Sequence, residues 1–151
     1  MSRHILLDSY PLSLAATPAR TPETVAITDW TTACLAAGHK IYIPEVIDYE
    51  LRRELLRAGK VRSVKKLDGL KAIFRFLPIT SAAMLLAADL WATSRQSGLP
   101  TGDPKKLDID AILAAQALTL GVPTSDLAVA TSNVKHLSRF VPTDLWSNIM
   151  S

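Results

Sequence analysis

Apolar residues along this chain fall into short continuous runs and longer periodic segments. The short runs, which are typical of buried strands, cover residues 4–8, 40–44, 73–79 and 127–131. The longer segments repeat apolar residues at helical spacing and cover residues 22–37, 45–58, 81–97 and 108–120. Each longer segment is followed by a glycine, which commonly ends a helix: Gly38, Gly59, Gly98 and Gly121.

Strands that alternate with helices favour parallel pairing through right-handed crossovers. The predicted fold class is therefore an α/β protein, a three-layer α/β/α sandwich around a central, mostly parallel sheet of four to five strands. No repeat or linker interrupts the pattern, so we predict a single domain over residues 1–151. Ser81 is the expected N-cap of the third helix, and residues 98–106 are expected to form a flexible loop.

Composition narrows the class of protein. Hydrophobic residues make up 48% and charged residues 21% of the chain, which is typical of a globular domain. A single cysteine excludes an internal disulfide and cysteine-rich zinc sites, and it fits a reducing compartment. No apolar run approaches the roughly 20 residues of a membrane span, and residues 5–7 are too short for a signal sequence. We therefore expect a cytoplasmic protein with no membrane partner.

Three carboxylates fall where predicted strands end or helices begin. Asp8 ends the first strand, Glu50 lies in the second turn of the helix after the second strand, and Asp110 lies in the first turn of the last long helix. The carboxyl ends of parallel strands meet at one edge of a sheet, where ligands bind. Converging carboxylates need a compensating cation, and Mg²⁺ prefers oxygen ligands of this kind. We therefore predict a Mg²⁺ site, with Mn²⁺ as a substitute.

Each acid also has a purely structural interpretation. Asp8 fits an Asx turn at the end of a strand. Glu50 fits a solvated helix face, and Asp108 and Asp110 fit the cap and first turn of a helix. Only the joint placement of the three acids favours a metal site.

Basic residues concentrate between positions 52 and 71, while the net charge of +3 by itself indicates little about partners. The basic side chains are Arg52, Arg53, Arg57, Lys60, Arg62, Lys65, Lys66 and Lys71. They fit a solvated helix face and the turn after it as well as they fit a phosphate-binding surface.

Four stretches of the chain together resemble the PIN-domain ribonucleases, in particular the VapC-like toxins of type II toxin–antitoxin systems. They cover residues 5–9, 43–53, 110–117 and 129–137. The sequence Asp-Ala-Ile-Leu-Ala-Ala-Gln-Ala at 110–117 is similar to the family signature that carries the third acid. The resemblance implies that Asp8, Glu50 and Asp110 are the metal ligands. It selects them over the neighbouring acids Glu45, Asp48, Glu54 and Asp108.

Two features depart from the family pattern. Asp-Ser-Tyr stands at 8–10 where Asp-Thr-Asn is usual, and Asn133 and His136 stand where many members have acids. Asn133 can assist catalysis through its carbonyl oxygen but adds no negative charge. We therefore expect a weaker site that holds one metal firmly and a second only with substrate. His136 fits a phosphate contact or an ordinary surface histidine, and Trp91 is expected in the core.

The resemblance implies a Mg²⁺-dependent endoribonuclease, in which a metal-activated water attacks the RNA phosphodiester and leaves a 3′-hydroxyl and a 5′-phosphate. The catalytic set would be Asp8, Glu50, Asp110 and Asn133, and the RNA contacts Arg52, Arg53 and Arg57. A cognate antitoxin and a homodimer are the implied protein partners. Two alternatives stay open: a PIN-like module that lost cleavage and binds RNA or a protein, and a non-toxin RNA-processing nuclease.

Overall fold

A parallel sheet forms the centre of the protein. The structure, a computed structural model, describes residues 2–98 and 104–150. Within these residues the strands are β1 (His4–Leu7), β2 (Lys40–Pro44), β3 (Arg75–Leu77), β4 (Leu127–Thr131) and β5 (Thr143–Leu145). Their order in the sheet is β3-β2-β1-β4-β5, and every neighbouring pair is parallel.

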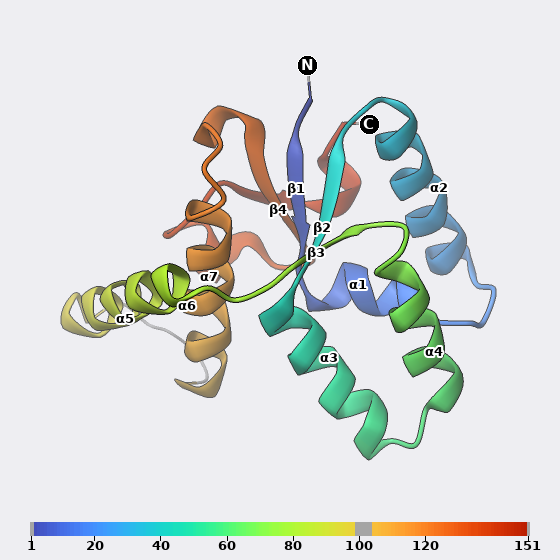
Figure 1. The fold of residues 1–151 in the computed structure, drawn as a ribbon, viewed down its shortest axis with the longest axis horizontal. Helices are drawn as coiled ribbons and strands as arrows, with labels where there is room; N and C mark the ends of the chain where they lie inside the picture. The colour runs from blue at the N-terminus through green and yellow to red at the C-terminus, as the bar shows by residue number, and fades with distance from the viewer. Residues whose placement is uncertain (1, 99–103, 151) are drawn as a thin grey trace.

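Helices cover the two faces of this sheet (Figure 1). They are α1 (Ser9–Ala16), α2 (Pro22–Ala36), α3 (Glu45–Arg57), α4 (Val61–Leu70), α5 (Ser81–Gln96), α6 (Pro104–Leu118) and α7 (Val134–Leu137). In Figure 1, α2 and α4 lie to one side of the strands, and α5, α6 and α7 lie to the other. The predicted α/β/α sandwich is confirmed. Among the described helices, none is long and apolar enough to cross a membrane.

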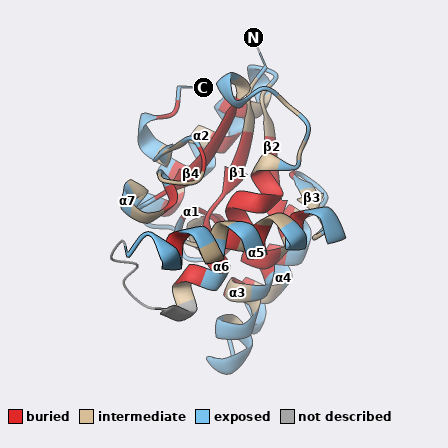
Figure 2. Ribbon diagram, turned by 90° about the vertical axis from the view of Figure 1, so that its left-hand side faces the viewer, coloured by how far each residue is buried: buried red, intermediate tan, exposed pale blue. Residues whose placement is uncertain are grey.

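The central strands β1 and β4 carry the core. Residues 5–7 of β1 and all of β4 are buried, and Figure 2 shows these strands enclosed by helices. Both strands have neighbours on each edge and helices on each face. The side chains on both faces of these strands are therefore apolar, which explains the continuous runs of apolar residues in the sequence.

Local signals explain most helix ends. Thr21 and Thr24 form a capping box at the start of α2, where Pro22 takes the first helical position. Gly38 and Gly59 follow α2 and α3 with φ values of +88° and +67°. Glycine adopts this conformation without steric cost, so the predicted stops at these two positions are confirmed.

Two predicted boundaries are wrong. The helix α6 begins at Pro104, so the end of the predicted loop is helical and Asp110 lies in the second turn rather than the first. Proline is favoured at a first helical position, which explains the earlier start. Residues 99–103 of that loop lie outside the described residues. The N-cap of α5 is Thr80, whose hydroxyl accepts from the N–H of Ala83, and Ser81 is the first helical residue.

The pattern also missed α1, α4, α7 and β5. The helix α1 is eight residues long and follows β1 directly, with Asp8 as its N-cap. The helix α4 lies inside the basic segment and buries only Ser63, Leu67 and Leu70. Its four apolar residues are interleaved with Arg62, Lys65, Lys66 and Asp68, so the segment was interpreted as a basic surface rather than as a packed helix.

An ion-pair network joins α3 to α4. The Arg52 guanidinium donates to both carboxylate oxygens of Asp48 at 3.0 Å and to Asp68 of α4 at 2.7 Å. Asp48 is buried, and Lys71 lies 3.4 Å from the same carboxylate. A buried charge left unpaired is strongly destabilising, so Arg52 both links two helices and compensates Asp48.

The variant Arg52→Gln is expected to lower the free energy of unfolding by about 1–3 kcal/mol, because it leaves the buried Asp48 with less compensation. Arg57→Gln is the matched control, since within residues 2–98 and 104–150 Arg57 pairs only with the exposed Glu54 of its own helix. Urea denaturation of both variants measures the difference. Equal effects would show that the network does not hold α3 against α4.

Candidate active site

The strand order reverses between β1 and β4, and the carboxyl ends of these strands are where a sheet of this kind has its ligand-binding crevice. From β1 the chain continues to β2 and β3 on one side of the sheet, and it later returns to β4 and β5 on the other. Ligands of such sheets bind where the strand order reverses. Asp8 follows β1 and Thr131 ends β4, so both lie at this point.

Asp8 is fixed by two hydrogen bonds. Its Oδ1 accepts from the N–H of Ser9, and its Oδ2 accepts from the hydroxyl of Thr131, each at 2.7 Å. The Thr131 hydroxyl in turn accepts from the backbone N–H of Asn133 at 3.1 Å. Asp8 is only 7% exposed. The local turn considered as an alternative is therefore present, but a second contact from β4 also holds the carboxylate at the crevice.

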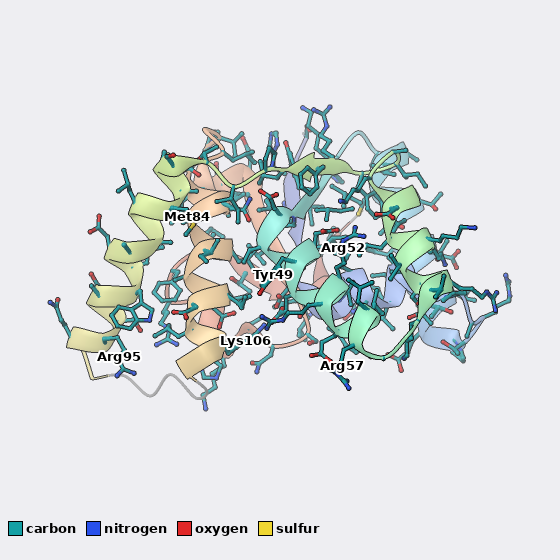
Figure 3. The ribbon with its side chains drawn as sticks, turned by 60° about the horizontal axis from the view of Figure 1, so that its bottom comes forward. Tyr49, Arg52, Arg57, Met84, Arg95 and Lys106 are labelled. Atoms are coloured by element: carbon teal, nitrogen blue, oxygen red, sulfur yellow. The ribbon has the colours of Figure 1, made fainter. Side chains whose placement is uncertain are left out.

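Glu50 and Asp110 meet around Lys106. The Nζ of Lys106 lies 3.2 and 3.3 Å from the two carboxylate oxygens of Glu50 and 3.9 Å from Oδ1 of Asp110. Figure 3 shows Lys106 between α6 and α3. Asp110 is 4% exposed, and its buried Oδ1 has no hydrogen-bond partner among the described residues. An unpartnered buried carboxylate oxygen is costly unless a proton or a cation compensates it.

The charges of this cluster act on one another. The pKa of Asp110 is raised to about 6, chiefly by burial and also by the carboxylates of Asp8 and Glu50, while Lys106 and Arg139 oppose the shift. Burial also disfavours the charged form of Lys106, but the three carboxylates outweigh this and raise the pKa of its ammonium. The acids at 8, 50 and 110 thus belong to one electrostatic cluster.

The donor set has the chemistry of a divalent metal site. Carboxylate oxygens suit a hard cation, and Oδ1 of Asp110 is available to one. In the described part of the chain, however, no three acidic, histidine or cysteine side chains lie close enough together to hold a metal. The cluster is arranged around the ammonium of Lys106, so binding of a metal requires these side chains to move together.

The other predicted site residues differ in their access to this cluster. Asn133 is exposed and caps α7, because its Oδ1 accepts from the N–H of Lys135 at 3.1 Å. Arg53 is exposed, lies over the ring of Tyr49, and lines a surface hollow together with Glu50. Arg52 is engaged by Asp48 and Asp68, and Arg57 lies at the end of α3 (Figure 3). Arg53 is therefore the arginine with the best access to a ligand at Glu50.

A family model decides the class of protein. The model of the PIN domain matches residues 14–137, which include Glu50, Asp110 and Asn133 and begin just after Asp8. The chain belongs to the PIN domain family. PIN domains are nucleases and generally use divalent metal ions. The carboxylate cluster of this PIN domain therefore fits the chemistry of its family.

Solved structures share the fold. VapBC2 from Rickettsia felis, bound to a DNA fragment from its promoter, is 17% identical with a TM-score of 0.69, over 95% of this chain and 98% of that one. FitAcB from Neisseria gonorrhoeae is 19% identical with a TM-score of 0.64, over 96% and 99%. VapBC-1 from nontypeable Haemophilus influenzae is 15% identical with a TM-score of 0.63, over 98% and 100%. A search of curated proteins finds no match.

Sequence reasoning missed two residues of this PIN domain site. Thr131 lies in a stretch that resembles the family, but nothing in the pattern indicated that its hydroxyl holds Asp8. Lys106 was predicted to lie in the loop of residues 98–106, whereas it lies in α6. Its spacing of four residues from Asp110 would have placed the two on one helix face, had the helix been extended back to Pro104.

The variant Asp110→Asn is expected to stabilise the metal-free protein at pH 7. The folded protein raises the pKa of Asp110 from its ordinary value of 3.8 to about 6, so wild type loses stability as the pH rises through 6. The amide avoids this loss, which amounts to roughly 2–3 kcal/mol at neutral pH and shrinks towards pH 4. Asp108→Asn, at an exposed position of the same helix, is the control. Urea denaturation in EDTA at both pH values tests this, and a less stable Asp110→Asn at pH 7 would contradict it.

Proposed function

We propose that this PIN domain is a Mg²⁺-dependent endoribonuclease, with Mn²⁺ as a substitute, and the toxin of a type II toxin–antitoxin pair. One observation carries the proposal: the carboxylate of Asp110 is buried beside the charges of Glu50 and Asp8, and its Oδ1 has no hydrogen-bond partner among the described residues. In a family of metal-dependent nucleases, such an oxygen is best explained as a ligand for a cation.

Asp8, Glu50 and Asp110 would hold the ion in this proposal. When bound, a divalent ion supplies a water of lowered pKa and neutralises charge on the phosphodiester. The N–H of Ser9 and the hydroxyl of Thr131 orient the Asp8 carboxylate, which limits the rearrangement that ligation needs. Burial of Asp8 and Asp110 keeps bulk water away from both carboxylates.

The substrate is proposed to be single-stranded or looped RNA, because a duplex cannot readily bring its phosphates to recessed acids. Arg53 is the leading phosphate contact, since it is exposed and shares a hollow with Glu50. Arg57 is a second contact at the end of α3. Arg52 would act mainly by holding α3 in place, because two carboxylates already engage its guanidinium. Asn133 is proposed to assist once its side chain leaves the cap of α7.

A protein partner is supported by an apolar surface on α5. Met84, Leu85 and Trp91 are exposed there, at 45%, 73% and 41%. The expectation that Trp91 lies in the core is therefore wrong. A contiguous exposed apolar patch marks a protein contact, and Met84 and Trp91 line one surface hollow between α5 and α6. The shared fold with VapBC complexes supports a cognate antitoxin as the partner; a homodimer and a cytoplasmic location belong to the same proposal.

A second candidate is a PIN module that binds RNA or a protein but no longer cleaves. The side chain of Asn133 is committed to capping α7, and the described acids surround a lysine rather than an ion. A module of this kind would bind RNA without cutting it and would show no metal binding at the acid cluster.

Cleavage of RNA by the purified full chain tests the proposal. Wild type with Mg²⁺ or Mn²⁺ is expected to cut a structured RNA, and EDTA is expected to abolish cutting. Asp110→Asn should lose at least about 100-fold in rate because it removes a ligand charge, whereas Asp108→Asn, two residues away and exposed, should keep the activity. Gel analysis of RNA and growth arrest on expression are the readouts.

Three other results would contradict the proposed nuclease or its site. RNA that stays intact with and without either metal would exclude the nuclease. RNA that is bound but uncut would favour the binding module. Equal activity of Asp110→Asn and wild type would show that the acid cluster is not the active site.

A further inference from the structure

Lys106 occupies both oxygens of a proposed metal ligand. It is the third residue of α6, one helical turn before Asp110, and its Nζ lies within 3.3 Å of Oε1 and of Oε2 of Glu50. The same Nζ is 3.9 Å from Oδ1 of Asp110. One ammonium therefore bridges α6 and α3 through two of the three acids.

This contact differs from an ordinary surface ion pair. The side chain of Lys106 is 37% exposed, but the carboxylates it faces are only 16% and 5% exposed. In the surface pair Arg57–Glu54 the corresponding values are 73% and 58%. Water screens the Lys106 contacts less, so the attraction between ammonium and carboxylates is stronger than at a surface.

An ammonium and a divalent ion need the same oxygen lone pairs. The ammonium donates N–H groups to the oxygens of Glu50, and a metal would take those oxygens as ligands. The two cations also repel each other over the few ångströms that separate them at the site. The ammonium of Lys106 and a divalent ion therefore cannot favourably bind the same carboxylates at the same time.

We propose that Lys106 is a tethered cation that competes with the divalent ion for Glu50 and Asp110, an inference that rests on the proposed function. Without metal, its ammonium compensates the two acids and stabilises the fold. The metal enters by displacing it, so this chain binds metal more weakly than its three acids alone would. Lys106 thereby sets the metal concentration at which the site fills.

Calorimetric titration of the full chain with Mn²⁺, combined with thermal melting in EDTA, tests this. Lys106→Met keeps the aliphatic stem and is expected to bind Mn²⁺ about tenfold more tightly, because the competing charge is gone. The same variant should melt at a lower temperature than wild type without metal. Lys106→Arg keeps the charge and should stay close to wild type in Mn²⁺ affinity.

Lys135→Gln is the matched control, because it removes the same charge two residues from Asn133. Lys135 forms no ion pair with the three acids among the described contacts. It should change neither measurement. Tightening by Lys135→Gln equal to that by Lys106→Met would assign the effect to overall charge and overturn the inference.

The remaining outcomes separate this inference from the proposed function. Wild type that binds Mn²⁺ and cleaves RNA, with Lys106→Met binding no more tightly, would overturn the competition and leave the nuclease intact. Binding of Mn²⁺ by none of the proteins would overturn both.

Discussion

Negative charge at the carboxyl edge of the sheet is held in place by contacts from neighbouring elements. The hydroxyl of Thr131 binds Asp8 across the boundary between β1 and β4, and Lys106 of α6 reaches Glu50 of α3. These contacts place one acid from each of three elements around the point where the strand order reverses. The packing of α3 and α6 against the sheet therefore has to satisfy electrostatics as well as the core.

Stability and function make opposite demands on these acids. Burial that keeps Asp110 ready for a cation also raises its pKa to about 6 and makes its charged form costly in the metal-free protein. By contrast, the buried Asp48, which lies two residues before Glu50 in α3, is paired with both Arg52 and Lys71. Asp48 thus serves the fold, while Asp110 keeps one buried oxygen without a hydrogen-bond partner among the described residues.

Much of the fold could be predicted because its central strands are continuous apolar runs and its long helices end in glycine. The helices α1 and α4 were missed, since α1 is short and α4 carries as many charged as apolar residues. Strand ends and family resemblance together led to the prediction of Asp8, Glu50 and Asp110 as metal ligands, and this remains a prediction. Lys106 was not identifiable, because its role depends on α6 starting at Pro104 and on the distance between two helices, which no local pattern encodes.

Asp8, Glu50 and Asp110 are proposed to form one divalent-cation site. Paramagnetic broadening of backbone amide NMR signals by Mn²⁺ tests this site directly, because the broadening reports distance from the ion. The first signals lost at low Mn²⁺ should come from residues around positions 8, 50, 110 and 131. Broadening centred elsewhere, or spread evenly over exposed acids such as Glu54 and Asp68, would contradict it.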